Sequence, residues 1–132
     1  MRDVTPAHRT RIDRLPDVLA RRVRHVVSEN RRVQETVTAL RAGDVAAVGR
    51  LFSASHASLR DDFEVSVSEV DRLVATAERD PDCYGARMTG GGFGGAVVAV
   101  VGRGSGASVA ARVCEGYGAP ASLVAIVGCA DT

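Results

Sequence analysis

The chain has 132 residues, a formal net charge of +1, 45% hydrophobic residues and 25% charged residues, which fits one domain with a core of its own. All 17 basic residues are arginines, so chemistry that needs a lysine from this chain, such as a Walker-type phosphate loop or a Schiff base, is excluded. No apolar run approaches the ~20 residues that span a bilayer, and no apolar stretch follows the first charges as in a secretory signal. We therefore expect a soluble, cytoplasmic protein without a membrane partner.

The positive charge is concentrated near the N-terminus. Residues 1–32 contain nine arginines against four acidic residues, a balance of +5, and the rest has eight arginines against twelve acidic residues, a balance of −4. The basic stretch has no aromatic residue to stack on a base, and acidic residues are interspersed among its arginines. It therefore predicts a solvated helix face rather than a nucleic-acid interface.

Residues 1–14 are polar and aperiodic, and we interpret them as a linker-like segment before a domain over residues 15–132. A long helix is expected from about Pro16 to just before Gly43. Asn30 interrupts its apolar stripe where a two-stranded coiled coil carries a buried asparagine, so dimerisation through this helix is an alternative to packing on the protein's own sheet. We favour packing on the sheet. The stripe follows helical spacing and comprises Leu19, Val23, Val26, Val33, Val37 and Leu40.

Two shorter helices are expected next. Asp44 is placed to cap a helix that runs to about residue 60. The spacing Ser66-x-x-Glu69 is a capping-box pattern. It predicts a third helix that stops before Asp80.

The following part of the chain predicts strands. Residues 84–89 and the valine-rich residues 96–101 are expected to be strands on either side of a glycine-rich loop. A small helix over about 105–115 and a last strand over 122–127 complete the order α-α-α-β-β-α-β. This order indicates an α+β domain.

The loop between the two predicted strands holds five glycines in the six positions 90–95. Its G-x-G-x-x-G spacing matches a dinucleotide-binding fingerprint, but a strand follows where that fingerprint needs a helix, so we reject this interpretation. A plain hairpin turn is one alternative, although it needs only one or two glycines with positive φ. The other is a loop whose backbone closely approaches a ligand, with successive N–H groups that bind an anion such as phosphate.

The stretch YGARMTGGGFGG, residues 84–95, resembles the third conserved motif of the GHMP kinases in the form typical of galactokinases. The stretches SHASLRDDFEVS, residues 55–66, and RRVRHVVSENRRV, residues 21–33, resemble the helical segments that precede this motif in the same family. The resemblance covers nearly the whole chain. It implies a kinase C-terminal domain in which a helical layer packs on a small antiparallel sheet.

The resemblance also implies a site. Galactokinases transfer the γ-phosphoryl group of Mg-ATP to the C1 hydroxyl of galactose, in a site between two domains. ATP and Mg²⁺ are thus the cofactors, and galactose the sugar substrate, of a complete enzyme. Phe93 is expected to anchor the glycine loop by packing, and Arg87 and Met88 to line the cleft. The residues expected near the ATP phosphates are Thr89, Gly90, Gly91, Gly92, Phe93, Gly94 and Gly95.

The chain lacks the N-terminal motifs of galactokinases. Neither a G-E-H-x-D-Y-type sugar-binding motif nor a G-L-S-S-S-type phosphate loop occurs in it, and the family's aspartate base belongs to the N-terminal domain. We assign no catalytic residue and no metal ligand within the chain. We expect it to supply the C-terminal half of a sugar kinase, to be inactive without an N-terminal kinase domain, and to self-associate weakly through the face of residues 84–95. The alternative is a stand-alone binding, regulatory or dimerisation domain.

Three further candidates have ordinary interpretations beside functional ones. Arg87 faces phosphate or pairs with an acid, and the two readings are equally supported. His56 follows Ser55 in a helix, and we expect a packing or surface histidine rather than the base of a nucleophile. Asp61 and Asp62 are expected to be solvated or to cap a helix rather than to bind a metal.

Overall fold

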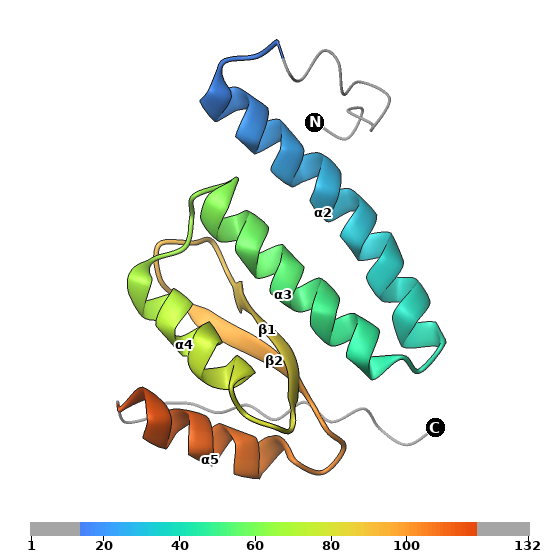
Figure 1. Cartoon of the computed structure of the whole chain (residues 1–132), viewed down its shortest axis with the longest axis vertical. Coiled ribbons are helices and arrows are strands. Elements are labelled where there is room, and N and C mark those ends of the chain that lie inside the picture. Colours follow the sequence, from blue (N-terminus) through green and yellow to red (C-terminus); the bar gives the residue numbers. More distant parts are fainter. Residues whose placement is uncertain (1–13, 119–132) are drawn as a thin grey trace.

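The computed structural model of the protein describes residues 14–118. Its order of elements confirms the α+β class and the expected succession of elements up to the last helix. The expected strand 122–127 and residues 1–13 of the linker-like segment lie outside the described residues. The elements, shown in Figure 1, are α2 (Asp17–Arg41), α3 (Val45–Asp61), α4 (Ser68–Glu78), β1 (Cys83–Thr89), β2 (Ala96–Val101) and α5 (Gly106–Tyr117).

The two strands form an antiparallel pair that contributes one face to the core. Ala86 lies opposite Ala99, and Met88 lies opposite Val97, so these side chains share one side of the sheet. Figure 1 shows α3 between α2 and the strands, and α5 on the far side of the molecule from α2. The core cluster consists of Val74, Ala77 and Ala86, with Cys83, Val97, Ala99 and Val113 packed against it.

The backbones of α3 and β1 are in direct contact at two buried glycines, Gly49 and Gly85. A Cβ atom on Gly85 would overlap the carbonyl group of Gly49 and lie 2.8 Å from Ser53 Oγ. A Cβ atom on Gly49 would overlap the carbonyl group of Tyr84 and lie 2.5 Å from its Cβ atom. The helix and the strand can therefore meet in this way only because both positions lack a side chain.

Helix α2 packs on α3 through polar side chains. His25 Nδ1 lies 2.9 Å from Ser58 Oγ, and Ser55 Oγ donates to Glu29 Oε2 over 2.6 Å. His25 also stacks on the ring of Phe63, with ring centroids 4.5 Å apart. Burial lowers the pKa of His25 below its usual 6.5, because a charged imidazolium loses solvation there.

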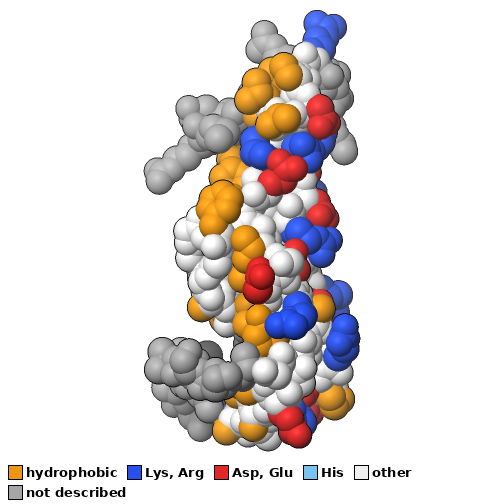
Figure 2. All heavy atoms as spheres, turned by 90° about the vertical axis from the view of Figure 1, so that its left-hand side faces the viewer, with side chains coloured by type: hydrophobic (Ala, Val, Ile, Leu, Met, Phe, Trp, Pro, Cys, Tyr) orange, Lys and Arg blue, Asp and Glu red, His pale blue; other side chains and the backbone are white. Residues whose placement is uncertain are grey.

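The predicted apolar stripe of α2 does not form this contact, so the expectation that it packs on the protein's own sheet is wrong for the described residues. Leu19, Val33 and Leu40 are 53%, 61% and 61% exposed. The reason is that the buried serines of α3 need hydrogen-bond partners, and the polar side of α2 supplies them. Figure 2, which views the molecule from the left of Figure 1, shows hydrophobic side chains at the upper end, where α2 begins.

The helix starts follow the sequence signals only in part. Asp44 caps α3 as expected, because its side chain accepts a hydrogen bond from Ala47 N over 2.8 Å. The capping box expected from Ser66 is wrong: α4 begins after Val67, and the Ser66 hydroxyl donates to Asp71 instead. A nearby carboxylate outcompetes the helix terminus for this hydroxyl group.

Helix α5 is held to the turn before β1 by one arginine. Arg112 donates to both oxygens of Asp80, at 2.7 and 2.9 Å, and to Asp82 at 2.8 Å. The guanidinium group lowers the pKa of the Asp80 carboxyl group. This charge-assisted pair holds α5 beside α4 and next to the start of β1.

Candidate functional site

The glycine loop, residues 90–95, connects β1 to β2. Its backbone has positive φ at Gly90, Gly92, Gly94 and Gly95, with values of 103°, 93°, 131° and 107°. Glycine adopts such angles without the strain that a side chain imposes. The loop thus uses four glycines for its own backbone path, more than the one or two of a simple hairpin turn.

Gly91 is the exception within the loop. Its φ does not lie in the positive range, and a Cβ atom built on it would meet no atom of the described residues within 4 Å. Cβ positions on Gly90 and Gly94 are equally open. One side of the loop is therefore bare backbone, and the fold of the described residues gives no reason for glycine at position 91.

The loop is seated on the segment between α3 and α4. Phe93 N donates to Val65 O over 2.7 Å, and a Cβ atom on Gly92 would lie 2.8 Å from the Cβ atom of Val65. The Phe93 side chain is 76% exposed. Phe93 thus contacts the rest of the chain through its backbone amide, and the expectation that its ring packs as the anchor is not met among the described residues.

Two arginines of α2 hold the same segment. Arg21 Nη1 and Arg22 Nη2 lie 2.9 and 2.6 Å from the carboxylate oxygens of Glu64, and Arg22 also donates to the carbonyl oxygen of Asp62 over 2.5 Å. These guanidinium groups lower the pKa of Glu64. A chain of contacts therefore runs from α2 through residues 62–65 to the glycine loop.

A buried histidine fixes the end of β1 just before the loop. His56, 4% exposed, accepts a hydrogen bond at Nδ1 from Met88 N over 3.3 Å, and its Nε2 lies 3.0 Å from Asp71 Oδ1. Because Nδ1 accepts, the ring proton sits on Nε2 and is donated to the carboxylate. Ser66 Oγ donates to the same oxygen over 2.6 Å. The expectation of a packing histidine is confirmed.

The two residues expected to line a cleft beside the loop differ in their surroundings. Arg87 Nη1 lies 3.8 Å from Glu29 Oε2, with a side-chain exposure of 31%, so of its two alternatives the described residues show the pairing with an acid. Met88 is 1% exposed, and its side chain belongs to the core. Thr89, the first of the expected phosphate-loop residues, is exposed at the end of β1.

The adjacent carboxylates of Asp61 and Asp62, at the end of α3, interact with arginines and a serine. Arg60 donates to both oxygens of Asp61 at 2.7 and 2.9 Å, which lowers the pKa of Asp61. Asp62 accepts from Ser58 and lies 3.9 Å from Arg24. Within residues 14–118, no group of three or more His, Cys, Asp or Glu side chains is arranged to hold a metal ion.

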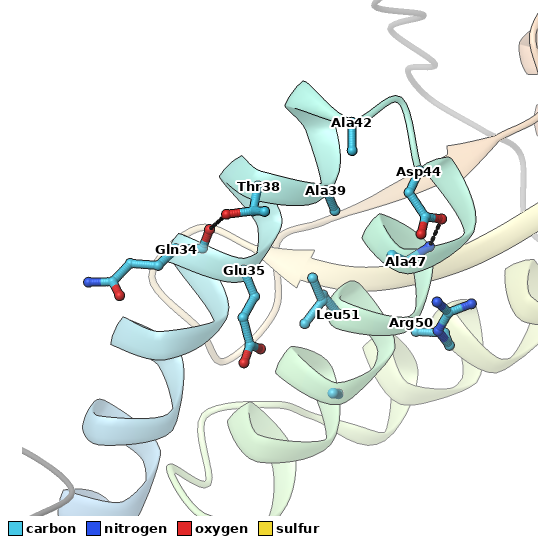
Figure 3. Close-up of a pocket in the computed structure, with 10 residues that line it drawn as sticks. Gln34, Glu35, Thr38, Ala39, Ala42, Asp44, Ala47, Arg50 and Leu51 are labelled. Atoms are coloured by element: carbon cyan, nitrogen blue, oxygen red, sulfur yellow. Dashed lines mark hydrogen bonds between the residues drawn. The ribbon is translucent and has the colours of Figure 1, made fainter.

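A separate groove of about 710 Å³ opens between α2 and α3, at the end of these helices that is remote from the glycine loop. Figure 3 shows its apolar surface, formed by Ala39, Ala42 and Leu51 among others. Two of its polar side chains are used within the helices: Thr38 donates to the carbonyl oxygen of Gln34, and Asp44 caps α3. Its other polar side chains are those of Gln34, Glu35 and Arg50, of which Glu35 lies 3.3 Å from Arg31 Nε.

Sequence reasoning missed the residues that support the loop. Glu64 and Val65 lie in a connection without periodicity, and Asp71 is one of two acidic residues in the first turn of α4. The spacing of His56 and Asp71 gives no signal either, because their contact depends on how α3 and α4 meet. None of the described helices is long and apolar enough to cross a membrane.

Comparison with known proteins places this arrangement in a family. The family model described as "GHMP kinases C terminal" matches residues 36–119, which include the glycine loop. Galactokinase from Roseiflexus sp. is 56% identical over 91 residues, 69% of this chain and 23% of that protein, and human galactokinase is 49% identical over 103 residues, 78% of this chain and 26% of that protein.

The fold agrees with a solved structure. The crystal structure of Lactococcus lactis galactokinase complexed with galactose superposes with a TM-score of 0.74 at 38% identity, covering 83% of this chain and 29% of that one. The chain thus spans about a quarter of the length of the galactokinases that it matches. The chain belongs to the GHMP kinase family, and its 132 residues resemble the C-terminal part of a galactokinase.

Proposed function

We propose that the chain supplies the phosphate-facing loop of an ATP-dependent sugar kinase that phosphorylates galactose at its C1 hydroxyl group. The observation that carries the proposal is Gly91. Its backbone angle does not require glycine, and its Cβ position is open. Such a glycine is explained when something outside the described residues must come close to the bare backbone. A triphosphate is the ligand that the family membership suggests.

The chemistry of the loop suits an anion. Residues 89–95 contain no acidic side chain, so nothing there repels phosphate, and successive backbone N–H groups in a glycine loop form an anion-binding concavity. The open Cβ positions of Gly90, Gly91 and Gly94 leave room for phosphate oxygens. When bound, Mg²⁺ neutralises charge on the phosphates. Because the loop has no carboxylate, the ion would be held by ATP and by groups outside the loop.

The support behind the loop fits the same role. Phosphoryl transfer depends mostly on positioning and charge stabilisation, and an error of about 1 Å in position can cost about 10²-fold in rate. His56 fixes the backbone at Met88 on one side of the loop, and Val65 O fixes Phe93 N within it. We propose that these contacts hold the loop in the position that the ATP phosphates require. The sugar site and the base would come from an N-terminal kinase domain, so the chain alone would be inactive.

The experiment is a full-length chimera. This chain replaces the matching segment of the Roseiflexus galactokinase, with which it shares 56% identity, and formation of galactose 1-phosphate is measured with Mg-ATP. We expect activity from the chimera and none from the 132-residue chain. The control is the Roseiflexus protein without the segment, which should be inactive. A folded chimera that binds galactose but forms no sugar phosphate would contradict the proposal.

A further inference from the structure

Helix α2 has a second face that the described fold leaves without a partner. Its polar side contacts α3 through His25, Glu29 and the arginines that hold Glu64. The apolar side, called here the α2 stripe, extends over ~30 Å at 1.5 Å per residue. The α2 stripe consists of Leu19, Val23, Val26, Val33, Val37 and Leu40.

Four of the six residues of the α2 stripe are exposed, and Val23 and Val26 are half-buried. Leu19, Val33, Val37 and Leu40 are 53%, 61%, 41% and 61% exposed, and helical spacing brings them onto one side of a single helix. Single exposed apolar residues need no explanation, but a group of them on one side of a helix, here Val33, Val37 and Leu40 after the polar break at Asn30, marks an interaction surface.

Most of the charge of α2 is neutralised within the chain. The helix contains six arginines and three acidic residues, a balance of +3, but Arg21 and Arg22 pair with Glu64, and Arg24 lies 3.9 Å from Asp62. Apolar contact rather than charge therefore decides which surface fits the α2 stripe.

The length of the relatives points to one partner. The chain corresponds to 23% and 26% of the two galactokinases compared above, so most of a kinase of that length lies outside these 132 residues. We propose that the α2 stripe is the surface on which this remaining part of the kinase packs. The existence of that part rests on the proposed function. The α2 stripe would then be a packing interface, separate from the glycine loop.

The test compares stability in two settings, the 132-residue chain and the full-length chimera described above. The variant Val33→Gln/Val37→Gln/Leu40→Gln removes apolar side chains but keeps residues that favour a helix. In the 132-residue chain we expect an unchanged midpoint of urea unfolding. In the chimera we expect the midpoint to fall and amide exchange along α2 to accelerate. The matched control is Val45→Gln, since Val45 is 43% exposed outside the stripe, and it should lower neither midpoint.

Each other outcome overturns the inference. Equal loss of stability in both settings would make the α2 stripe part of this chain's own fold. An unchanged unfolding midpoint of the chimera carrying the triple variant would show that the rest of the kinase does not pack on the stripe. Sedimentation that shows a dimer of the 132-residue chain, converted to monomer by the triple variant, would make a second copy the partner. Because stability is read without catalysis, an inactive chimera with a destabilising stripe variant would contradict only the proposed function.

Discussion

The contact of α3 with β1 gives the sharpest prediction for stability. Replacing Gly85 by alanine puts a Cβ atom into the carbonyl group of Gly49 and within 2.8 Å of Ser53 Oγ. A flexible side chain can move aside, but a carbonyl group within α3 can yield only if the helix shifts away from the strand. Overpacking of a closely packed site costs about 1–3 kcal/mol, and the backbone contact puts Gly85→Ala at the upper end, about 2–3 kcal/mol.

The same substitution at the partner glycine, Gly49→Ala, separates the cost of packing from the gain in helix propensity. Gly49→Ala meets the Tyr84 carbonyl group in the same way, but alanine in a helix interior gains about 1 kcal/mol over glycine. We therefore expect Gly49→Ala to cost about 1–2 kcal/mol. For a domain of about 100 residues, each kcal/mol lowers Tm by roughly 4–8 °C.

The assay is thermal and urea unfolding of the 132-residue chain, followed by circular dichroism. Gly91→Ala is the control, because its Cβ position is open and its φ is not positive, and it should leave stability unchanged or raise it by about 0.4–1 kcal/mol. If Gly85→Ala lowered Tm by less than about 3 °C, the two glycines would not be in contact through their backbones and the α3–β1 packing would be different.

Three more predictions concern side chains around the loop and the α2–α3 contact. His56→Leu leaves the buried Met88 N–H without an acceptor and removes one of two donors to Asp71 Oδ1, so it should lower the free energy of unfolding by about 1–3 kcal/mol, read from urea unfolding. Phe93→Ser should change stability by no more than about 0.5 kcal/mol, because the ring is exposed and only the backbone amide binds Val65; a cooperative loss of structure would restore the ring as the anchor. The folded-state pKa of His25 lies below the unfolded value of 6.5, so the unfolded chain binds more protons near and below this pH, and stability should fall as pH drops from 7.5 to 5.5. His25→Gln should flatten that slope in urea unfolding measured across the same pH range.

The sequence predicted the local elements well because their signals are local. Asp44 caps α3, Gly43 has the positive φ of a helix end, and alternation and valine content located β1 and β2. The glycine loop was found because its composition has no ordinary use in a hairpin. These features depend on a few neighbouring residues, which a single sequence displays.

The long-range contacts were not predictable in the same way. Apolar periodicity indicated which side of α2 would be buried, but the hydrogen bonds of Ser55 and Ser58 turned an adjacent, polar side of the helix towards α3. The role of Gly49 appears only when Gly85 is placed against it. The hydrogen bond from Phe93 N to Val65 O likewise joins segments about 30 residues apart in the sequence, and no spacing pattern predicts such a contact.

The most direct measurement of the central claim is the ATP dependence of the chimera with Gly91→Val. The substitution fills open space beside bare backbone, so the unfolding midpoint should be unchanged. If the loop faces the ATP phosphates, kcat/KM for ATP should fall by about 10²-fold or more, in line with the cost of misplacing a reacting group by about 1 Å, while the affinity for galactose stays the same. A stable variant whose kcat/KM for ATP remains within about twofold of the unsubstituted chimera would contradict the claim that Gly91 leaves room for phosphate.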